Sequence, residues 1–177
     1  SLAFLSTSRD HKNEKLRVAD AVSGAVREVY EESTNTQFES GQGTVNWRYL
    51  PASNEFVWFT ERDGWGHLYL YDLNTGKLKN QITKGDWAVW QVLKVDDKAR
   101  VIYGLAGGHE KGVNPYFGQV FRVNFDGSGF QMLTPEPANH NITFSPDGKY
   151  FIDNFSTPDT PITAVLRDSS GKLIASL

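Results

Sequence analysis

A hairpin pattern that recurs four times along the 177-residue chain constrains its fold more than any other feature. The segments that carry it are LRVADAVSGAVREVY, LYLYDLNTGKLKNQIT, VFRVNFDGSGFQMLT and TAVLRDSSGKLIASL. Each reads as a strand, a tight turn with a glycine, and a second strand, because glycine takes the positive-φ turn position without steric cost. The turn glycines are 52, 53 and 42 residues apart, at Gly24, Gly76, Gly129 and Gly171.

Short runs with strand character occupy much of the rest of the chain, for example LAFLSTS, EFVWFTE, RVIYGLAG, NITFS and KYFIDNF. They are rich in aromatic and β-branched residues, alternate with polar residues and are bounded by turn signals such as Ser145-Pro146-Asp147-Gly148. Long windows with the apolar spacing of an amphipathic helix are absent from the sequence. These patterns predict an all-β fold.

Two hairpins per period of about 40–50 residues make a four-stranded unit, the size of a propeller blade. A β-sandwich would have similar strands without this regular repeat, and a coincidence of turn residues is the remaining alternative. We therefore predict a partial β-propeller of about three to four four-stranded antiparallel blades. The approximate units are 1–34, 42–85, 88–135 and 138–177.

Composition excludes several classes of function. A chain with 39% hydrophobic and 22% charged residues is typical of a globular domain, and a net charge of −3 does not favour nucleic acid or an anionic membrane as partner. No apolar stretch is long enough to span a bilayer. The absence of cysteine excludes disulfides, thiolate metal sites and a cysteine nucleophile. The start at Ser1–Leu2, directly in an apolar run, favours a chain cut from a longer protein.

The segment TERDGWGH, from Thr60 to His67, carries several groups that can do acid–base chemistry. Glu61 and Asp63 could form an acid–base pair, or His67 could act as a base beside Asp63. The structural alternative, which we favour, is a turn between two strands whose Asp63-Gly64 dipeptide suits a hairpin and whose charges are solvated or ion-paired. The sequence thus predicts a structural hairpin here.

The other candidates are weaker. The histidines His11, His67, His109 and His140 lack the spacing of metal ligands, so we expect no metal and no cofactor. Asp96-Asp97 reads as a turn. The glycine-rich loop Ala106–Gly118 is the least regular stretch and the best place for a contact with substrate, a partner domain or another subunit, although a plain connecting loop is favoured. Asn141-Ile142-Thr143 fits the glycosylation triplet, but within a strand it carries little weight.

Three motifs in order resemble one family. WFTERDGWGHLYLYD, ITKGDWAV and NITFSPDGKYFIDNFST are similar to the N-terminal propeller domain of the dipeptidyl peptidase IV family of serine peptidases, and most of all to its bacterial members. The resemblance covers essentially the whole chain. It implies the last few blades of an eight-bladed propeller that ends just before a catalytic α/β-hydrolase domain.

The resemblance also implies a function. The family releases N-terminal dipeptides with proline or alanine in the second position, uses a Ser-Asp-His triad in the hydrolase domain, and holds the substrate's amino terminus with a glutamate pair on an earlier blade. None of these residues is placed in this chain. Gly-x-Ser-x-Gly is absent, Gly127 and Gly129 flank Ser128 too closely, and Glu31-Glu32 ends a strand rather than sitting in a helical insertion.

The expected function therefore has two levels. The chain itself is expected to be non-catalytic, with no catalytic, cofactor-binding or metal-binding residue, to wall the substrate cavity and to dock on the hydrolase domain. The longer protein would be a periplasmic or extracellular serine dipeptidyl peptidase. The alternative is a stand-alone binding propeller of the periplasmic type without an enzymatic partner domain; a sialidase-type propeller is disfavoured because its turn repeat is missing. An open arc would expose apolar end faces, so we expect the chain alone to self-associate or to curl.

Overall fold

The computed structural model describes residues 1–38 and 46–177, and in this part of the chain all regular structure is β. The strands form four antiparallel sheets in which hydrogen-bonded neighbours are consecutive in the chain. This confirms the predicted all-β class. Residues 42–45, the start of the second predicted unit, lie outside the described residues.

The four sheets follow one another in sequence, and we number them 1 to 4. Sheet 1 has three strands, β1 (Leu2–Thr7), β2 (Asn13–Ala19) and β3 (Val26–Ser33). Sheet 2 contains β4 (Arg48–Leu50), β5 (Glu55–Thr60), β6 (His67–Asp72) and β7 (Leu78–Gln81). Sheet 3 contains β8 (Ala88–Asp96), β9 (Val101–Gly107), β10 (Gln119–Asn124) and β11 (Gln131–Met132). Sheet 4 contains β12 (Asn139–Phe144), β13 (Tyr150–Ser156), β14 (Thr163–Asp168) and β15 (Leu173–Ser176).

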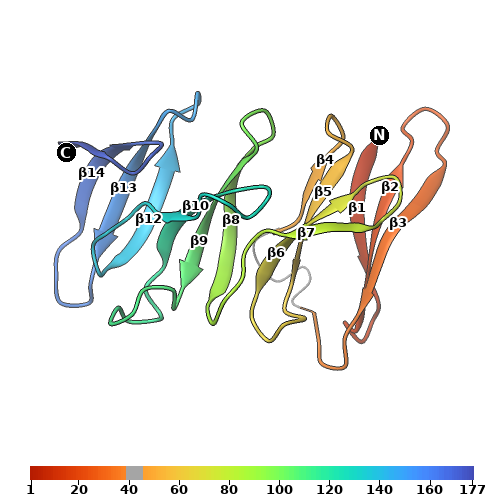
Figure 1. Ribbon diagram of the computed structural model, residues 1–177, viewed down its shortest axis with the longest axis horizontal. Helices are drawn as coiled ribbons and strands as arrows, with labels where there is room; N and C mark the ends of the chain where they lie inside the picture. Colours follow the sequence, from red (N-terminus) through yellow and green to blue (C-terminus); the bar gives the residue numbers. More distant parts are fainter. Residues whose placement is uncertain (39–45) are drawn as a thin grey trace.

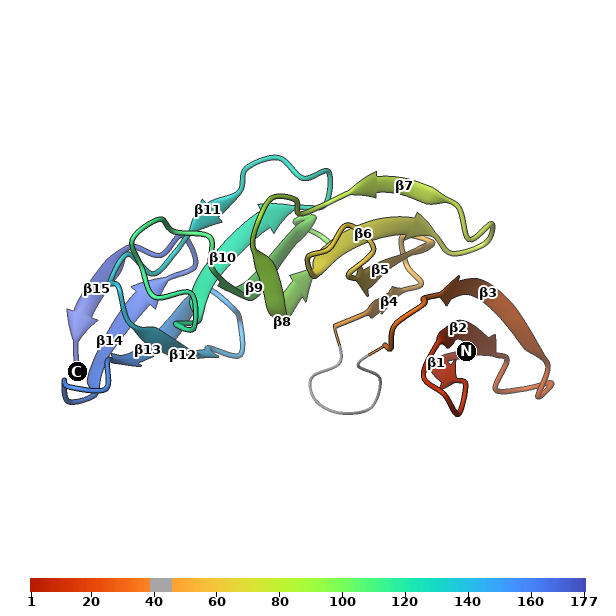
Figure 2. The same ribbon diagram turned by 90° about the horizontal axis from the view of Figure 1, so that it is seen from below.

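The sheets stand side by side along the long axis of the molecule (Figure 1). Seen from below, they are arranged along an arc, with β7 and β11 on its convex side (Figure 2). An arc of antiparallel sheets that each lie face to face with the next is a partial β-propeller, as the repeat predicted. The predicted boundaries of the repeat units stay a prediction.

The two ends of the sheets differ. The connections β1–β2, β5–β6, β9–β10 and β13–β14 lie together at one end, at the bottom of Figure 1, which we call the loop end. The predicted glycine turns lie in the β2–β3, β6–β7, β10–β11 and β14–β15 hairpins, which start from the other ends of these strands. All four glycines have positive φ, with angles of 73° at Gly24, 65° at Gly76, 63° at Gly129 and 87° at Gly171.

An aspartate opens three of these hairpin turns and explains their shape. The Asp72 carboxylate accepts hydrogen bonds from the amides of Asn74 and Thr75, at 3.0 and 2.8 Å, and bonds from the Thr75 amide and hydroxyl lower the pKa of Asp72. Asp20 accepts hydrogen bonds from the amides of Val22 and Ser23, and Asp168 accepts them from the amides of Ser170 and Lys172. These side chains bind backbone amides a few residues further on, as a backbone carbonyl does in a turn. The turns therefore depend on local sequence and can be predicted from it.

Three cores lie between the sheets. Aromatic side chains dominate the first, between sheets 1 and 2, and aliphatic side chains dominate the second, between sheets 2 and 3. Because side chains alternate along β5, this strand contributes to both of these cores: Phe56 and Trp58 pack toward sheet 1, and Val57 packs toward sheet 3. The third core joins sheets 3 and 4 through residues such as Tyr103, Val120 and Phe151. Burial on both faces is why β5 and β6 read as nearly continuous apolar runs.

Among residues 1–38 and 46–177, no helix has the length and apolar character that crossing a bilayer would need.

Candidate functional site

The β5–β6 hairpin, residues 61–66, lies at the loop end beside the last residues of β3. Arg62 reaches from it to sheet 1, donating to the Tyr30 hydroxyl at 2.8 Å and to the Glu32 carboxylate at 2.7 Å. Its guanidinium carbon also lies 4.8 Å from the centre of the Tyr69 ring, which is a cation–π geometry. Although burial opposes its charge, the Glu32 carboxylate and the Tyr30 hydroxyl raise the pKa of Arg62. Arg62 therefore links sheet 2 to sheet 1.

Glu32 accepts the hydrogen bonds that connect the two sheets here. Besides Arg62, it accepts hydrogen bonds from the Trp58 indole at 2.6 Å and the Thr60 hydroxyl at 2.5 Å. Its side chain is 12% exposed, so these donors compensate for most of its lost hydration. The neighbouring Glu31 points elsewhere: hydrogen bonds from Asn13 and then from Lys15 lower the pKa of Glu31. Adjacent residues of a strand face opposite ways, so the two carboxylates do not converge on one ligand.

Asp63 is also held within its own sheet. It accepts hydrogen bonds from the Tyr69 hydroxyl and, at 3.1 Å, from the Gln81 amide. Burial, followed by the bond to Asp63, raises the pKa of Tyr69. No hydrogen bond or ion pair joins Asp63 to Glu61 or His67 among the described contacts. Arg62 and Asp63 thus hold the hairpin in place through hydrogen bonds. This agrees with the structural interpretation of TERDGWGH.

His67 occupies a position that repeats in the next sheet. Its Nδ1 lies 3.1 Å from the Thr83 hydroxyl and its Nε2 lies 2.9 Å from the Gly85 carbonyl, while the Thr83 hydroxyl also accepts the Leu68 amide. In sheet 3 the buried Gln119 is the first residue of β10, as His67 is of β6. The Thr134 hydroxyl accepts a hydrogen bond from the amide of Val120, the residue after Gln119. A buried glutamine at the equivalent place in sheet 3 indicates that the contacts at this position can be made without an imidazole.

A cleft of about 480 Å³ opens between the end of β3 and the β5–β6 hairpin. Glu14 and Glu32 both line it, and they are directly opposite each other on β2 and β3. Opposed carboxylates repel, and Arg62, which also lines the cleft, binds Glu32. Phe59, Thr34 and Gly64 complete this part of the wall. The cleft is therefore polar and acidic, which suits a cationic or hydrogen-bonding group of a ligand.

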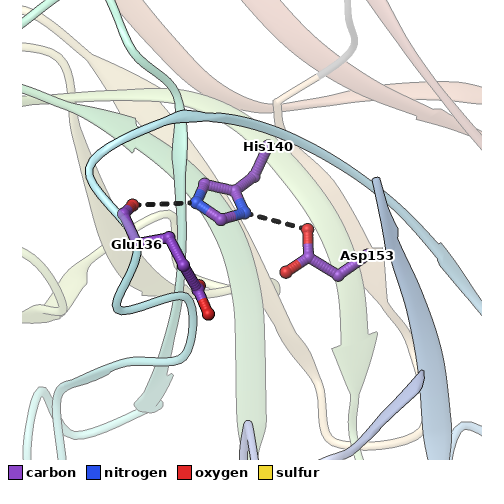
Figure 3. A group of neighbouring side chains, drawn as sticks. All are labelled: Glu136, His140 and Asp153. Carbon is purple, nitrogen blue, oxygen red and sulfur yellow. Dashed lines mark hydrogen bonds and ion pairs between the residues drawn. The ribbon is translucent and has the colours of Figure 1, made fainter. Parts of the chain in front are cut away.

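A second cluster lies at the boundary of sheets 3 and 4. One ligand-type atom from each of Glu136, His140 and Asp153 lies within 4.8 Å of the others (Figure 3). The Arg167 guanidinium binds both carboxylates, at 3.0 Å from Asp153 and 2.6 Å from Glu136. Both ring nitrogens of His140 also have protein partners. Because Arg167 supplies the compensating cation, the residues do not fit a metal site.

The remaining sequence candidates are dispersed. The predicted Asp96-Asp97 turn is present, and the Asp96 carboxylate caps it by accepting the Ala99 amide at 2.9 Å. His109 stacks on Phe130 with ring centres 4.7 Å apart, and His11 lies in the β1–β2 turn with a φ of 55°. Asn141 is exposed on β12. Of the predicted loop Ala106–Gly118, the first two residues belong to β9, and residues 108–118 join β9 to β10 at the loop end, where Tyr116 is 84% exposed.

Sequence reasoning missed the roles of Glu136, Asp153 and Arg167. One signal was available, because Asp153 and Arg167 fall on inward positions of β13 and β14, where apolar residues are expected. A charged residue at an inward strand position predicts a buried partner. The partner's identity depends on which strands become neighbours.

Three comparisons with known proteins agree. The family model described as "Dipeptidyl peptidase IV (DPP IV) N-terminal region" matches residues 1–162. Dipeptidyl peptidase 4 of Arthroderma otae is 28% identical over an alignment of 172 residues that covers 91% of this chain and 20% of the relative. Dipeptidyl peptidase 4 of Trichophyton rubrum is 32% identical over 111 residues, covering 60% of this chain and 13% of the relative.

Solved structures show the same fold. The crystal structure of Porphyromonas gingivalis dipeptidyl peptidase 4 has a TM-score of 0.83 at 22% identity and covers 99% of this chain and 24% of that protein. A putative dipeptidyl aminopeptidase IV from Bacteroides ovatus has a TM-score of 0.77 at 26% identity, covering 99% of this chain and 27% of that one. The chain spans about a fifth of the length of the first curated relative. With the model match over 162 residues, the chain belongs to the dipeptidyl peptidase IV family and forms part of its N-terminal β-propeller region.

Proposed function

We propose that this chain is the non-catalytic propeller portion of a dipeptidyl peptidase IV-like serine exopeptidase that releases N-terminal Xaa-Pro and Xaa-Ala dipeptides. The observation that carries the proposal is the family match over residues 1–162. Of the acid–base candidates in the segment TERDGWGH, Asp63 is bound by Tyr69 and Gln81, and His67 is bound by Thr83 and Gly85. The chemistry is therefore assigned to a hydrolase domain elsewhere in the longer protein.

In this proposal the loop end walls the substrate cavity and docks on the hydrolase domain. Two features support the choice of end. The acidic cleft at Glu32 and Arg62 opens there, and the exposed aromatic side chains of Trp65 and Tyr116 lie on loops of the same end. Exposed aromatic side chains mark contact surfaces more often than exposed polar turns do. The four glycine turns of the opposite end are short, and among the described residues no exposed aromatic side chain lies in them.

The periplasmic or extracellular location belongs to the same proposal. It rests on the kind of activity, since a peptidase that trims free peptides acts where those peptides occur. The test is fractionation of the source cells with an antibody against residues 1–177.

The activity is tested on the longer protein and on the 177-residue chain in parallel. We expect the longer protein to release the chromophore from Gly-Pro and Gly-Ala anilides with a free amino terminus. An acetylated Gly-Pro anilide is the matched control and should not be cleaved. The 177-residue chain alone should be inactive. A longer protein without this activity, or with further blades in place of a hydrolase domain, would favour the stand-alone binding propeller.

A further inference from the structure

His140 is buried near the start of β12, and both of its ring nitrogens face acceptors (Figure 3). Nδ1 lies 2.9 Å from the Asp153 carboxylate, and Nε2 lies 3.0 Å from the backbone carbonyl of Glu136. A carbonyl oxygen can only accept a hydrogen bond, and so can an ionised carboxylate. A neutral imidazole has one donor and one acceptor nitrogen, so it cannot satisfy both contacts.

The surroundings favour an ionised Asp153 and a charged His140. The Arg167 guanidinium donates to the second oxygen of Asp153 at 3.0 Å and to the Glu136 carboxylate at 2.6 Å. The titratable and charged groups that face His140 in the described chain are Glu136 from the β11–β12 connection, Asp153 from β13 and Arg167 from β14. The apolar ring of Phe155 lies 5.2 Å away. Two cations then balance two anions in a network that is buried except for Glu136, whose side chain is 34% exposed.

We propose that protonated His140 is a pH-sensitive lock that holds the connection between sheets 3 and 4 against sheet 4. The proton lets His140 donate to both Asp153 on β13 and the Glu136 carbonyl in the connection. When the proton leaves, one acceptor loses its donor, and the network keeps two carboxylates against one cation. A buried acceptor without a donor is costly, so the connection opens more easily.

The direction with pH follows from proton linkage. The locked state binds one proton more than the state in which His140 is neutral. By proton linkage, a fall in pH therefore favours the lock and a rise in pH favours the opened connection. His67 is the internal control, because the Thr83 hydroxyl can donate to its Nδ1 and a neutral ring satisfies both of its contacts.

The lock is tested by hydrogen–deuterium exchange of the longer protein, read by mass spectrometry and corrected for intrinsic rates. Between about pH 6 and pH 9, we expect protection of peptides spanning residues 134–140 and 150–156 to fall as the pH rises, because the locked state binds the additional proton. Peptides that contain His67 should keep their protection. In His140→Gln, protection of the same two segments should no longer depend on pH.

Either of two results would overturn the proposal: protection that does not change with pH in the wild type, or the same pH dependence in His140→Gln. If the variant does not fold, neutron crystallography of the wild-type protein at about pH 7.5 decides the question, since deuterium is directly visible. Deuterium on both ring nitrogens of His140, with one on His67, supports the lock. A bare nitrogen on His140 refutes it.

Discussion

The Glu55 carboxylate at the start of β5 forms a two-armed ion pair with the Arg100 guanidinium in the β8–β9 turn, and so links sheet 2 to sheet 3. Glu55 is 2% exposed and also binds Lys79 on β7. Arg100 holds a positive φ of 59° and places its guanidinium carbon 4.1 Å from the centre of the Phe125 ring. A carboxylate with two cations at a sheet boundary contributes to stability through several contacts at once.

Removing this charge should destabilise the chain in a pH-dependent way. Burial opposes ionisation of Glu55, but hydrogen bonds from Arg100 and Lys79 dominate and lower its pKa below the ordinary value. Its stabilisation is thus present above the unfolded pKa and is lost as the pH falls through the folded one. Glu55→Gln should cost about 1–3 kcal/mol at neutral pH, less than a fully buried pair because both cations are partly exposed.

Urea unfolding at neutral pH and at about pH 3.5 measures this difference, which should shrink in acid. Glu61→Gln, on the exposed β5–β6 hairpin, is the matched control and should change stability by less than about 0.5 kcal/mol. A difference between wild type and Glu55→Gln that stays constant with pH would contradict the assignment.

Two turn glycines separate backbone strain from close packing. Gly24 and Gly76 have similar positive φ angles of 73° and 65°. A Cβ at Gly76 would lie 2.2 Å from the Val29 carbonyl of sheet 1, whereas one at Gly24 would have no atom within 4 Å. Gly24→Ala should cost about 1 kcal/mol from strain alone, and Gly76→Ala should cost about 1–3 kcal/mol more. Equal losses in urea unfolding would show that the Gly76 turn does not pack this closely.

His67 gives a test that distinguishes a structural role from a catalytic one. Gln119 holds the equivalent place in sheet 3, so His67→Gln should cost less than about 1 kcal/mol, and His67→Leu should cost about 1–3 kcal/mol because buried partners lose a bond. Peptidase activity of the longer protein should stay within about twofold in His67→Gln. A loss of about 100-fold or more at normal stability would instead indicate a general base.

The outer face of sheet 4 predicts self-association of the 177-residue chain. On β13, Phe151 and Asp153 face inward, while Tyr150 and Ile152 are 43% and 40% exposed on the other face. Light scattering after gel filtration should show a mass above that of a monomer that increases with concentration. Ile152→Lys should lower this mass, and Val22→Lys, in an exposed turn, should not. A monomer at all concentrations would contradict the prediction.

The sequence predicted the turns and the fold class because their causes are local. Gly76 takes a positive φ and Asp72 binds the amides two and three residues on, so both act within a few positions. The same locality explains why the hairpin Asp63-Gly64 was predicted as a turn. The partners of its charges were not predicted, because Arg62 pairs with Glu32 thirty positions earlier in another sheet.

By itself, then, the sequence determined the strands, their hairpins and the repeating unit, and its motifs indicated the family. Only the tertiary structure decided which charged groups meet: Arg62 with Glu32, Glu55 with Arg100, and His140 with Asp153 and Arg167. The physical reason is that turn chemistry and side-chain alternation act over a few residues. Buried ion pairs instead depend on which sheet faces come together, and that depends on the packing of the whole arc.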